Sequence, residues 1–549
     1  MTTADAPIAR PAPSGVAAST WSPLRRKLFR TLWVAQLCAN VGTWMQVVGA
    51  QWLLVGEPNA TTLVALVQTA ISLPLVLLAL PSGVLADVFD RRRLLMGAQA
   101  YQGAVAAAMA VITLSGEMTP VLLLSMTFAL SCGAALMVPA WQAIQPDLVP
   151  REQIPSAMAL SGVNTNVARA VGPAIAGALV AAAGAGWVFA VNAASFVVAA
   201  GLVSRWRQAD KPAETPERLV AALWAGGRYV RHSLVVRRVL LRTALFIVPG
   251  SALWALLPVV AHGRLGLDAS GYGLLLGALG VGAVTGALAL GPLRARLPVS
   301  ASIAGFTVIY AGATLVLGHA RAPLLGIAVL VAAGLAWLGV FSTLMAANQI
   351  ALPGWVRARG AATWMLVFML GQAIGAVGWG LVGQRFGVPL AMTVAAGLLV
   401  LGALTIRLWP LIDDADIDRS PSMHWATPEL VFSPDPREGP VVVSLVYRVP
   451  PDNAAAFTAA MQRVGRSRRR TGATRWALHR DGADLARFVE LYTVPSWSEH
   501  LRQHHGRITT ADRTFEEAAL TCTDGSPVEV SHLFPSGLGS APDAAPAGP

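Results

Sequence analysis

Arg169 is the first residue whose type and position point to chemistry, because it is the single charge in an apolar stretch over residues 156–183. If that stretch is a membrane helix, a central arginine costs about 2.5–3.5 kcal/mol, and such residues usually face the protein interior and have a partner. Candidate partners are backbone carbonyls, the amides of Asn164 and Asn166, or an anionic ligand. The alternative is that Arg169 lies near the end of its helix and extends to the membrane surface.

Two histidines form a second candidate group. His500 and His504 are four residues apart, so both imidazoles would lie on one face of a helix. This spacing can hold a metal ion, but no acidic residue or cysteine accompanies the pair, and a solvated helix face explains it better. We therefore expect no metal, no cofactor and no enzymatic activity.

A third group is the charged segment that reads Gly83-Val84-Leu85-Ala86-Asp87-Val88-Phe89-Asp90-Arg91-Arg92-Arg93. A carboxylate such as Asp87 can accept hydrogen bonds from the N-terminal end of a facing helix, where the helix dipole is positive. The helix expected to begin near Gly360 is the candidate. The alternative is an ordinary basic loop. Contact between Asp87 and that helix could open and close one end of the protein, so we call the segment a gate motif. Its residues are Gly83, Asp87, Arg91 and Arg92.

Polar and aromatic side chains within apolar stretches could line a cavity for a cargo. Amides and indoles suit an aromatic, hydrogen-bonding molecule, although many such residues only join helices or anchor them at the membrane surface. The candidates are Asn40, Trp44, Gln46, Gln142, Arg169 and Asn348. Close helix packing and a kink are expected at Gly172, Pro173 and Gly177.

Composition shows which elements must position these residues. The chain has 549 residues, of which 55% are hydrophobic and only 13% charged, whereas soluble domains are about 25% charged. A membrane helix needs about 20 apolar residues. We predict an all-α membrane protein with twelve such helices, over 31–56, 58–86, 94–116, 118–146, 156–183, 187–204, 243–263, 269–293, 297–320, 322–356, 360–384 and 386–406.

Lysine and arginine set the expected orientation. The net charge of +12 falls in short clusters between the apolar stretches, which is the membrane pattern and not that of a nucleic-acid-binding protein. Nearly all clusters lie on one side if both termini are cytoplasmic. We expect a multi-pass protein of the inner (plasma) membrane, in contact with the lipid bilayer.

The chain divides at its longest basic loop into two halves of six helices that resemble each other, as expected for a duplicated transporter architecture. The predicted organisation is a disordered tail (1–23), a first bundle (24–204), a cytoplasmic basic loop (205–242), a second bundle (243–410), a linker (411–439), a soluble tail domain (440–534) and a disordered end (535–549).

The tail domain has the alternation of a small α+β domain. Strands are expected over 441–449, 474–479, 485–494 and 528–533, with helices over 452–470 and 496–511, the second capped by Ser496 with Glu499 at the capping-box spacing. The order βαββαβ predicts a ferredoxin-like fold. Such a domain could pair with a second copy, so a homodimer is a further expectation.

At this point the chain resembles the major facilitator superfamily, whose loop motif Gly-x-x-x-Asp-x-x-Gly-Arg-Arg/Lys is similar to the segment from Gly83, with Asp90 where glycine is commonest. Gly172-Pro173 and Gly177 are similar to a motif of many antiporters. Within the superfamily, the chain resembles the enterobactin-exporter branch, through Leu32-Trp33-Val34-Ala35-Gln36, Asn40-Val41-Gly42-Thr43-Trp44-Met45-Gln46, Pro139-Ala140-Trp141-Gln142-Ala143 and Asp147-Leu148-Val149-Pro150-Arg151-Glu152.

The tail domain resembles dimeric α/β-barrel domains of the antibiotic-biosynthesis monooxygenase type, through its element order and Glu490-Leu491-Tyr492, Trp497 and His500. Together the resemblances imply a secondary transporter that exports a small amphiphilic molecule, siderophore or drug, by alternating access. Two alternatives remain: a membrane-tethered enzyme or sensor whose tail domain acts on a small molecule, and an importer.

Overall fold

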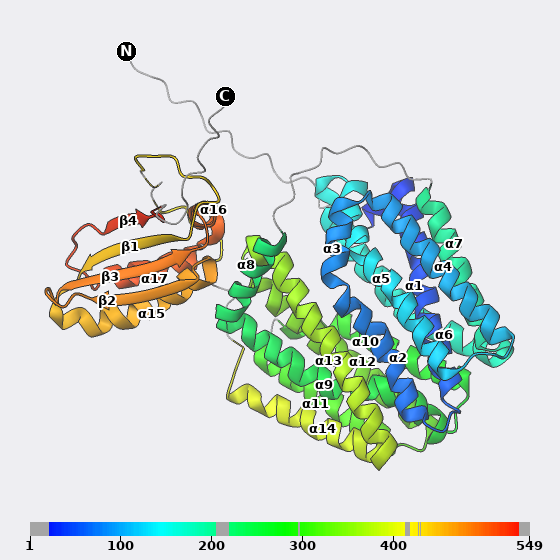
Figure 1. The fold of residues 1–549 in the computed structure, drawn as a ribbon. Helices are drawn as coiled ribbons and strands as arrows, with labels where there is room; N and C mark the ends of the chain where they lie inside the picture. Colours follow the sequence, from blue (N-terminus) through cyan, green and yellow to red (C-terminus); the bar gives the residue numbers. More distant parts are fainter. Residues whose placement is uncertain are drawn as a thin grey trace, which may run out of the picture.

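The computed structural model describes residues 21–204, 219–294, 297–411, 418–425, 428 and 430–536. It contains two helical halves and a separate α+β domain beside one end of the helical part (Figure 1). The expected disordered segments 1–23 and 535–549 lie almost entirely outside the described residues.

The first half contains seven helices, one more than expected, because the predicted helix 58–86 is broken. Pro81 has no N–H to donate to the carbonyl of Leu77, four residues earlier, so the helix stops there and restarts after Leu78. The elements are η1 Ser22–Arg25, α1 Lys27–Leu54, α2 Ala60–Leu77, α3 Ala79–Val88, α4 Arg91–Leu114, α5 Pro120–Ile144, η2 Gln145–Leu148, η3 Arg151–Gln153, α6 Ile154–Ala183 and α7 Ala185–Ser204.

The second half is preceded by a helix that we did not predict. The expected basic loop 205–242 contains α8 Leu219–His232 and the first turns of α9. The buried ring of Tyr229 and neighbouring apolar side chains hold α8 against the connection before α13. The remaining elements are α9 Leu234–Gly263, α10 Ala269–Arg294, α11 Val299–His319, α12 Pro323–Ile350, η4 Gly354–Val356, α13 Arg357–Phe386, α14 Val388–Leu404 and η5 Thr405–Arg407.

Eleven helices in the described part of the chain are long and apolar enough to cross a membrane. α1 is more polar and is not among them, although its 28 residues are sufficient. We count α1 as the twelfth because it packs along α6 and α7 inside the bundle, where its amides are buried. The predicted all-α membrane architecture is therefore confirmed.

The two halves are joined mainly by α2 against α13 and α6 against α10. We call the end of the bundle that carries Arg91–Arg93 and the start of α13 the basic end. Cross-half contacts lie toward the opposite end: the Tyr272 hydroxyl donates to Gln51 Oε1 over 2.6 Å, and the Trp52 and Tyr272 rings stack at 5.9 Å. At the basic end, α3 packs on α2, α4 and α5, within its own half. The halves thus meet at the end opposite to the tail domain (Figure 1).

The tail domain has the predicted element order around one antiparallel sheet. Its strands are β1 Val441–Arg448, β2 Arg475–Arg480, β3 Arg487–Val494 and β4 Glu529–Leu533, in the spatial order β2-β3-β1-β4. β1 is central, with Val443 opposite Tyr492 on β3 and His532 on β4. α15 Ala454–Thr471 and α17 Thr510–Leu520 cover one face of the sheet (Figure 1).

The predicted helix 496–511 is wrong in its extent. α16 Trp497–Arg502 continues into a π-helical turn, Gln503–Arg507, that ends where Gly506 takes φ 143°, a conformation that favours glycine. α17 then starts with its own capping box of Thr509 and Asp512. Ser496 does cap α16 by accepting from Glu499 N, but the Glu499 side chain binds arginines instead of closing a second capping box.

The linker 411–439 is also more ordered than expected. Within its described part, Pro421 forms a β-bridge with Thr509, and Ser422 N donates to Ile508 O over 2.8 Å. Trp497 N donates to Glu438 O over 2.8 Å. These stretches of the linker therefore belong to the tail domain.

Candidate functional site

Arg169 lies where the two halves meet. Its guanidinium carbon is 5.3 Å from the centre of the Trp44 ring on α1, a cation–π contact. Trp44 in turn lies 6.4 Å from Trp254 on α9, in the other half. Trp254 contacts Trp337 on α12 at 5.5 Å, so an aromatic cluster continues into the second half. The structure thus brings Arg169 and Trp44, two of the predicted residues, together with Trp254.

Two donors of this cluster lack partners. Arg169 Nε and Trp254 Nε1 are both buried, and neither has a hydrogen-bond partner among the described residues. Arg242 is 4% exposed and its Nε also has no partner in the described part of the chain, but its two terminal nitrogens donate to carbonyls at the end of α14 and beyond and to Thr405 Oγ1. Burial without hydrogen bonds costs free energy, so the Arg169–Trp254 region is suited to an acceptor brought by a ligand.

The expected amide partners of Arg169 are engaged elsewhere. Asn164 Nδ2 donates to Trp33 O over 2.8 Å, and Asn164 Oδ1 accepts from Asn40 Nδ2 over 2.8 Å. Asn166 Nδ2 donates to Gly162 O over 2.9 Å on its own helix. Asn40 therefore joins α1 to α6, and the two amides are not the partners of Arg169.

The other polar candidates are dispersed. Gln46 is 2% exposed and lies between α1, α4 and α7, where its Oε1 accepts from Asn192 Nδ2 over 2.9 Å. Asn348 Nδ2 donates to Gly360 O over 3.3 Å near the basic end, and Gln142 is exposed. No hydrogen bond joins these three side chains to the cluster of Arg169, Trp44 and Trp254 among the described residues.

The glycines of α6 divide between two neighbours. A Cβ on Gly172 would lie 2.7 Å from Trp44 Cβ, which shows how closely α6 approaches α1. A Cβ on Gly177 would lie 2.5 Å from Ala269 O and 2.9 Å from Gly273 Cα on α10, in the other half. Pro173 presents its carbonyl oxygen to the same Gly273. Gly280, two helical turns after Gly273 on α10, also lies against α6, because its Cβ would be 2.9 Å from Ala170 Cα. This spacing of small residues is a sequence signal of close packing that we did not use.

The gate motif lies at the basic end. Gly83 is on α3, Asp87 is in its last turn, and Arg91 begins α4; the side chain of Asp87 lies outside the described part. Arg92 Nη2 donates to Ser204 O at the end of α7. A cavity of about 430 Å³ lies beside the motif, lined by Phe89, Asp90, Arg93, Leu94, Gly97, Ala98, Tyr101 and Leu136. None of the predicted cavity residues lines it.

The tail domain contacts the membrane part at α8 and η4. Arg228 Nη2 on α8 lies 3.7 Å from Glu499 Oε2 on α16. The Arg507 guanidinium carbon lies 4.8 Å from the centre of the Trp355 ring, and that of Arg470 lies 5.7 Å from the Tyr229 ring. Opposite charges therefore attract in one of these three contacts, while in the other two the positive charge is on the tail domain and meets an aromatic ring of the membrane part.

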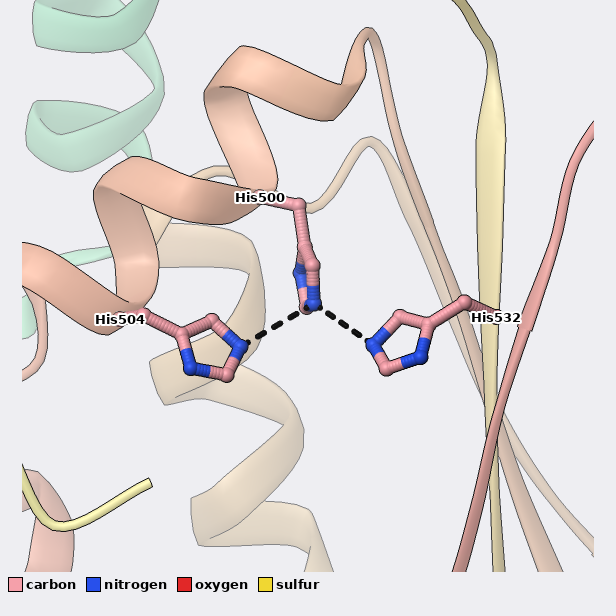
Figure 2. A group of neighbouring side chains, drawn as sticks. All are labelled: His500, His504 and His532. Carbon is pink, nitrogen blue, oxygen red and sulfur yellow. Dashed lines mark hydrogen bonds between the residues drawn. The ribbon is translucent and has the colours of Figure 1, made fainter. Parts of the chain in front are cut away.

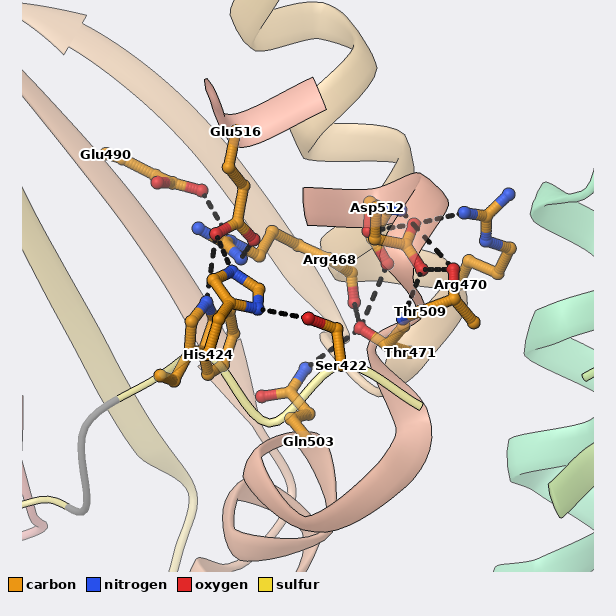
Figure 3. A network of polar contacts seen from close by, with 12 residues as sticks. Ser422, His424, Arg468, Arg470, Thr471, Glu490, Gln503, Thr509, Asp512 and Glu516 are labelled. Atoms are coloured by element: carbon orange, nitrogen blue, oxygen red, sulfur yellow. Dashed lines mark hydrogen bonds and ion pairs between the residues drawn. The ribbon is translucent and has the colours of Figure 1, made fainter. Parts of the chain in front are cut away.

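A buried polar network organises the tail domain (Figure 3). Arg468 is 2% exposed and donates to Glu490 Oε1 over 3.0 Å and to Glu516 Oε1 over 2.5 Å. His424 Nε2 and Trp425 Nε1 of the linker contact Glu516 Oε2 at 3.0 and 2.9 Å. Burial alone would raise the pKa of Glu516, but Arg468 and the two hydrogen bonds outweigh it and lower the pKa to about 2.

The histidine pair is not a solvated face. His500 is 1% exposed, and the ring of His532 on β4 joins the rings of His500 and His504 (Figure 2). Burial, and then the neighbouring His504 and His532, lower the pKa of His500 to about 3, so the ring is neutral. His532 could not have been found from helical spacing because it lies on a different element.

A family model described as a transmembrane secretion effector matches residues 18–536, which includes both halves and the tail domain. The multidrug efflux pump Tap of Mycobacterium tuberculosis (strain ATCC 25618 / H37Rv) is 28% identical over 272 residues, covering 44% of this chain and 64% of the pump. The staphyloferrin A transporter of Staphylococcus aureus (strain NCTC 8325 / PS 47) is 28% identical over 161 residues, covering 29% of this chain and 40% of that transporter.

Solved structures show the same fold. A bacterial homolog of the human lysosomal transporter Spinster has a TM-score of 0.57 at 14% identity, covering 70% of this chain and 97% of that one. The nucleoside transporter NupG has a TM-score of 0.51 at 13% identity, covering 70% of this chain and 98% of that one. The chain therefore spans less than two thirds of the length of the curated relatives above but nearly all of these folds.

Proposed function

We propose that this chain, which belongs to the transmembrane secretion effector family of the major facilitator superfamily, is a secondary transporter that exports small amphiphilic molecules by alternating access. Relatives that share part of its sequence are named as a multidrug efflux pump, the staphyloferrin A transporter and, in Streptococcus pyogenes, macrolide efflux protein A. Siderophores and drug-like molecules of that kind are the cargo class we propose, and we propose that the chain belongs to the enterobactin-exporter branch.

The observation that carries the proposal is the pair of unpaired donors between the halves. Arg169 Nε and Trp254 Nε1 are buried without a partner among the described residues, and an unsatisfied buried donor costs about 1–3 kcal/mol. A cargo with an anionic or strongly accepting group would satisfy them, and its ring would stack on Trp44 and Trp254. Siderophores and many drugs combine such an acceptor with aromatic or apolar surface.

The closed end favours export from the basic side. The halves meet at the opposite end through Gln51, Tyr272 and Gly177, so a cargo would enter this state from the basic end, the proposed cytoplasmic side. Asp87 would form the latch of the alternate state with the start of α13. Import would need cargo to enter from the opposite end, so the direction of flux in vesicles of known orientation distinguishes the two.

Arg169→Gln tests the site. It removes the charge and should lower cargo affinity about 10- to 150-fold, as expected for a hydrogen bond to a charged group worth about 1.5–3 kcal/mol. Arg169→Lys keeps the charge but loses the planar fork, and should be impaired for a cargo that needs two contacts. The assay is accumulation of a macrolide, an aromatic dye and a siderophore in cells that express each variant at equal level.

Arg321→Gln is the matched control. Arg321 is exposed at the opposite end of the bundle, so the same substitution there should leave accumulation unchanged. If Arg169→Gln and Arg321→Gln export equally well, Arg169 is structural and the site lies elsewhere. If no cargo class is exported by the wild type, the transport proposal itself is refuted.

For the tail domain we propose a regulatory or oligomerising role, and not catalysis. Its docking on α8 and η4 through Arg228–Glu499 and Arg507–Trp355 supports regulation, because η4 directly precedes α13, which packs against the other half. A likeness to monooxygenase-type domains supports pairing with a second copy. A tethered enzyme remains the competing function; turnover of a cargo-like molecule by the purified chain would favour it.

Arg228→Glu tests the docking, because it places two negative charges together while Glu499 keeps its bonds to Arg507 and Arg502. We expect faster proteolysis of the linker and a changed transport rate. Arg231→Glu, on an exposed position of the same helix, is the control. Equal proteolysis and transport in both variants would contradict a regulatory contact, and a mass that stays monomeric in solution would contradict pairing.

A further inference from the structure

Three histidine nitrogens converge in the tail domain (Figure 2). His500 lies on α16, His504 in the π-helical turn that follows, and His532 on the edge strand β4. His500 Nε2 is 2.9 Å from His532 Nε2 and 3.2 Å from His504 Nε2. One ring nitrogen from each side chain lies within 4.8 Å of the others. We propose that these three residues form a site for one divalent transition-metal ion.

The distances suit an ion. Imidazole nitrogens bind zinc at about 2.0–2.1 Å, so two of them in a tetrahedral arrangement lie about 3.4 Å apart. The two shorter separations are close to this value, and small side-chain rotations would bring all three to it. Without an ion, His500 Nε2 faces two other ring nitrogens, although a neutral imidazole offers only one hydrogen or one lone pair there. A shared cation satisfies all three lone pairs at once.

The hydrogen bond on the far side of His500 sets its tautomer. His500 Nδ1 lies 3.2 Å from Gln503 Oε1, an atom that can only accept, so Nδ1 carries the hydrogen and Nε2 presents a lone pair. The amide orientation is fixed in turn, because Gln503 Nε2 donates to Thr471 Oγ1 over 3.3 Å. Metal-binding histidines are typically oriented in this way by a second shell.

Aromatic side chains surround the three imidazoles. The ring of Trp425 contacts His504, that of Trp497 contacts His532, and that of Tyr492 contacts His500. Neutral imidazoles with no carboxylate suit zinc, copper, nickel or iron, and not magnesium or calcium. Three protein ligands leave a fourth position for water or a small ligand.

The site adjoins the contact with the membrane part. Glu499, which lies beside Arg228 of α8, directly precedes His500 in the sequence. An ion bound by His500 and His504 would fix this turn of the chain, so metal binding and docking are coupled through one helix turn. The proposal itself does not depend on transport.

The test is zinc binding by the full-length protein, purified in detergent with a tag that contains no histidine and stripped with a chelator. Zinc is titrated against a competing chelating dye, and bound metal is counted by mass spectrometry. We expect one zinc per chain. His504→Asn and His532→Asn should weaken binding at least tenfold, and Gln503→Leu by about 10- to 100-fold through loss of the second shell.

His505→Asn is the matched control, since His505 is adjacent in sequence but exposed and outside the group. It should bind zinc as the wild type does. X-ray absorption of the zinc-loaded protein should show three imidazole nitrogens at about 2.0–2.1 Å. Zinc should also raise the Tm of the wild type and of His505→Asn, and not that of His504→Asn.

Two results would overturn the site: less than one zinc bound per chain in the wild type, or equal affinity in His504→Asn, His532→Asn and His505→Asn. Folding is checked for each variant by its elution volume and its Tm without metal. If His504→Asn is unfolded, His532→Asn decides the question alone, because His532 is a half-buried position on an otherwise exposed edge strand.

Discussion

Gly177→Ala should shift the chain away from the arrangement described here. The added Cβ would lie 2.5 Å from Ala269 O and 2.9 Å from Gly273 Cα, both backbone atoms of α10 that cannot rotate away. A normal contact between carbon and oxygen is about 3.3–3.6 Å, so α6 and α10 must separate by about 1 Å at this point. The contact between Gly177 and α10 joins the halves only while the end of the bundle opposite to the basic end is closed.

The size of the effect follows from overpacking. An extra carbon in a well-packed interface costs about 1–3 kcal/mol, and this cost applies only to the state in which Gly177 and Gly273 touch. The ratio of that state to the alternate state should therefore fall about 5- to 150-fold. Gly162→Ala is the control, because its Cβ would have no neighbour within 4 Å. Any gain in helix propensity from alanine is shared by both variants.

The assay is a pulsed electron–electron distance measurement across the basic end, in a chain whose three native cysteines are replaced. Spin labels at Leu28→Cys on α1 and Ala358→Cys on α13 report the separation of the halves, and both positions are exposed. Closing the basic end in the alternate state shortens this distance. We expect the short-distance fraction to grow in Gly177→Ala and to stay at the wild-type value in Gly162→Ala. Identical distributions in the two variants would refute the reasoning.

Tyr272→Phe removes the hydrogen bond to Gln51 that joins the two halves. It should lower the ratio of the state described here to the alternate state about fivefold, for a bond worth about 1 kcal/mol. Tyr310→Phe is the control, because the Tyr310 hydroxyl binds Gly250 O within one half; equal shifts in both variants would contradict a role of Tyr272 in closure. Asp87→Asn should lower export without lowering membrane insertion, since it removes the proposed latch; undiminished export at equal expression would exclude it. The tail domain should lose about 3 kcal/mol of stability as the pH falls from about 4.5 to about 2, because a carboxylate whose folded pKa is depressed stabilises only while ionised. Tryptophan fluorescence follows this acid transition, which Glu516→Gln should flatten; an unchanged transition would show that Glu516 does not cause it.

Local patterns were sufficient for most of the architecture. Apolar length predicts each membrane helix, because every backbone polar group in lipid must be satisfied within its own helix. The main error in the first half, the break between α2 and α3, was also local: Pro81 cannot donate to the carbonyl of Leu77, and the sequence contains that information.

The tail domain shows where local patterns fail. The order of strands and helices follows from the alternation of apolar and polar residues and from the lengths of the connections. The predicted helix 496–511, however, is broken at Gly506. The helix α8 was missed because residues 205–242 were interpreted as one basic loop, although Leu219, Leu223 and Val230 recur at helical spacing in it.

Twelve membrane-spanning stretches, two similar halves, the tail domain and the unusual charge of Arg169 were all predictable from local sequence, because each depends on residues close together in the chain. The contacts of these residues, in contrast, became known only from the packing of the folded chain. Arg169 stacks on Trp44, which lies 6.4 Å from Trp254 of the other half, and His532 completes a group with two histidines about thirty residues earlier. Both juxtapositions join separate elements whose relative placement is set by packing, and no spacing in the sequence encodes it.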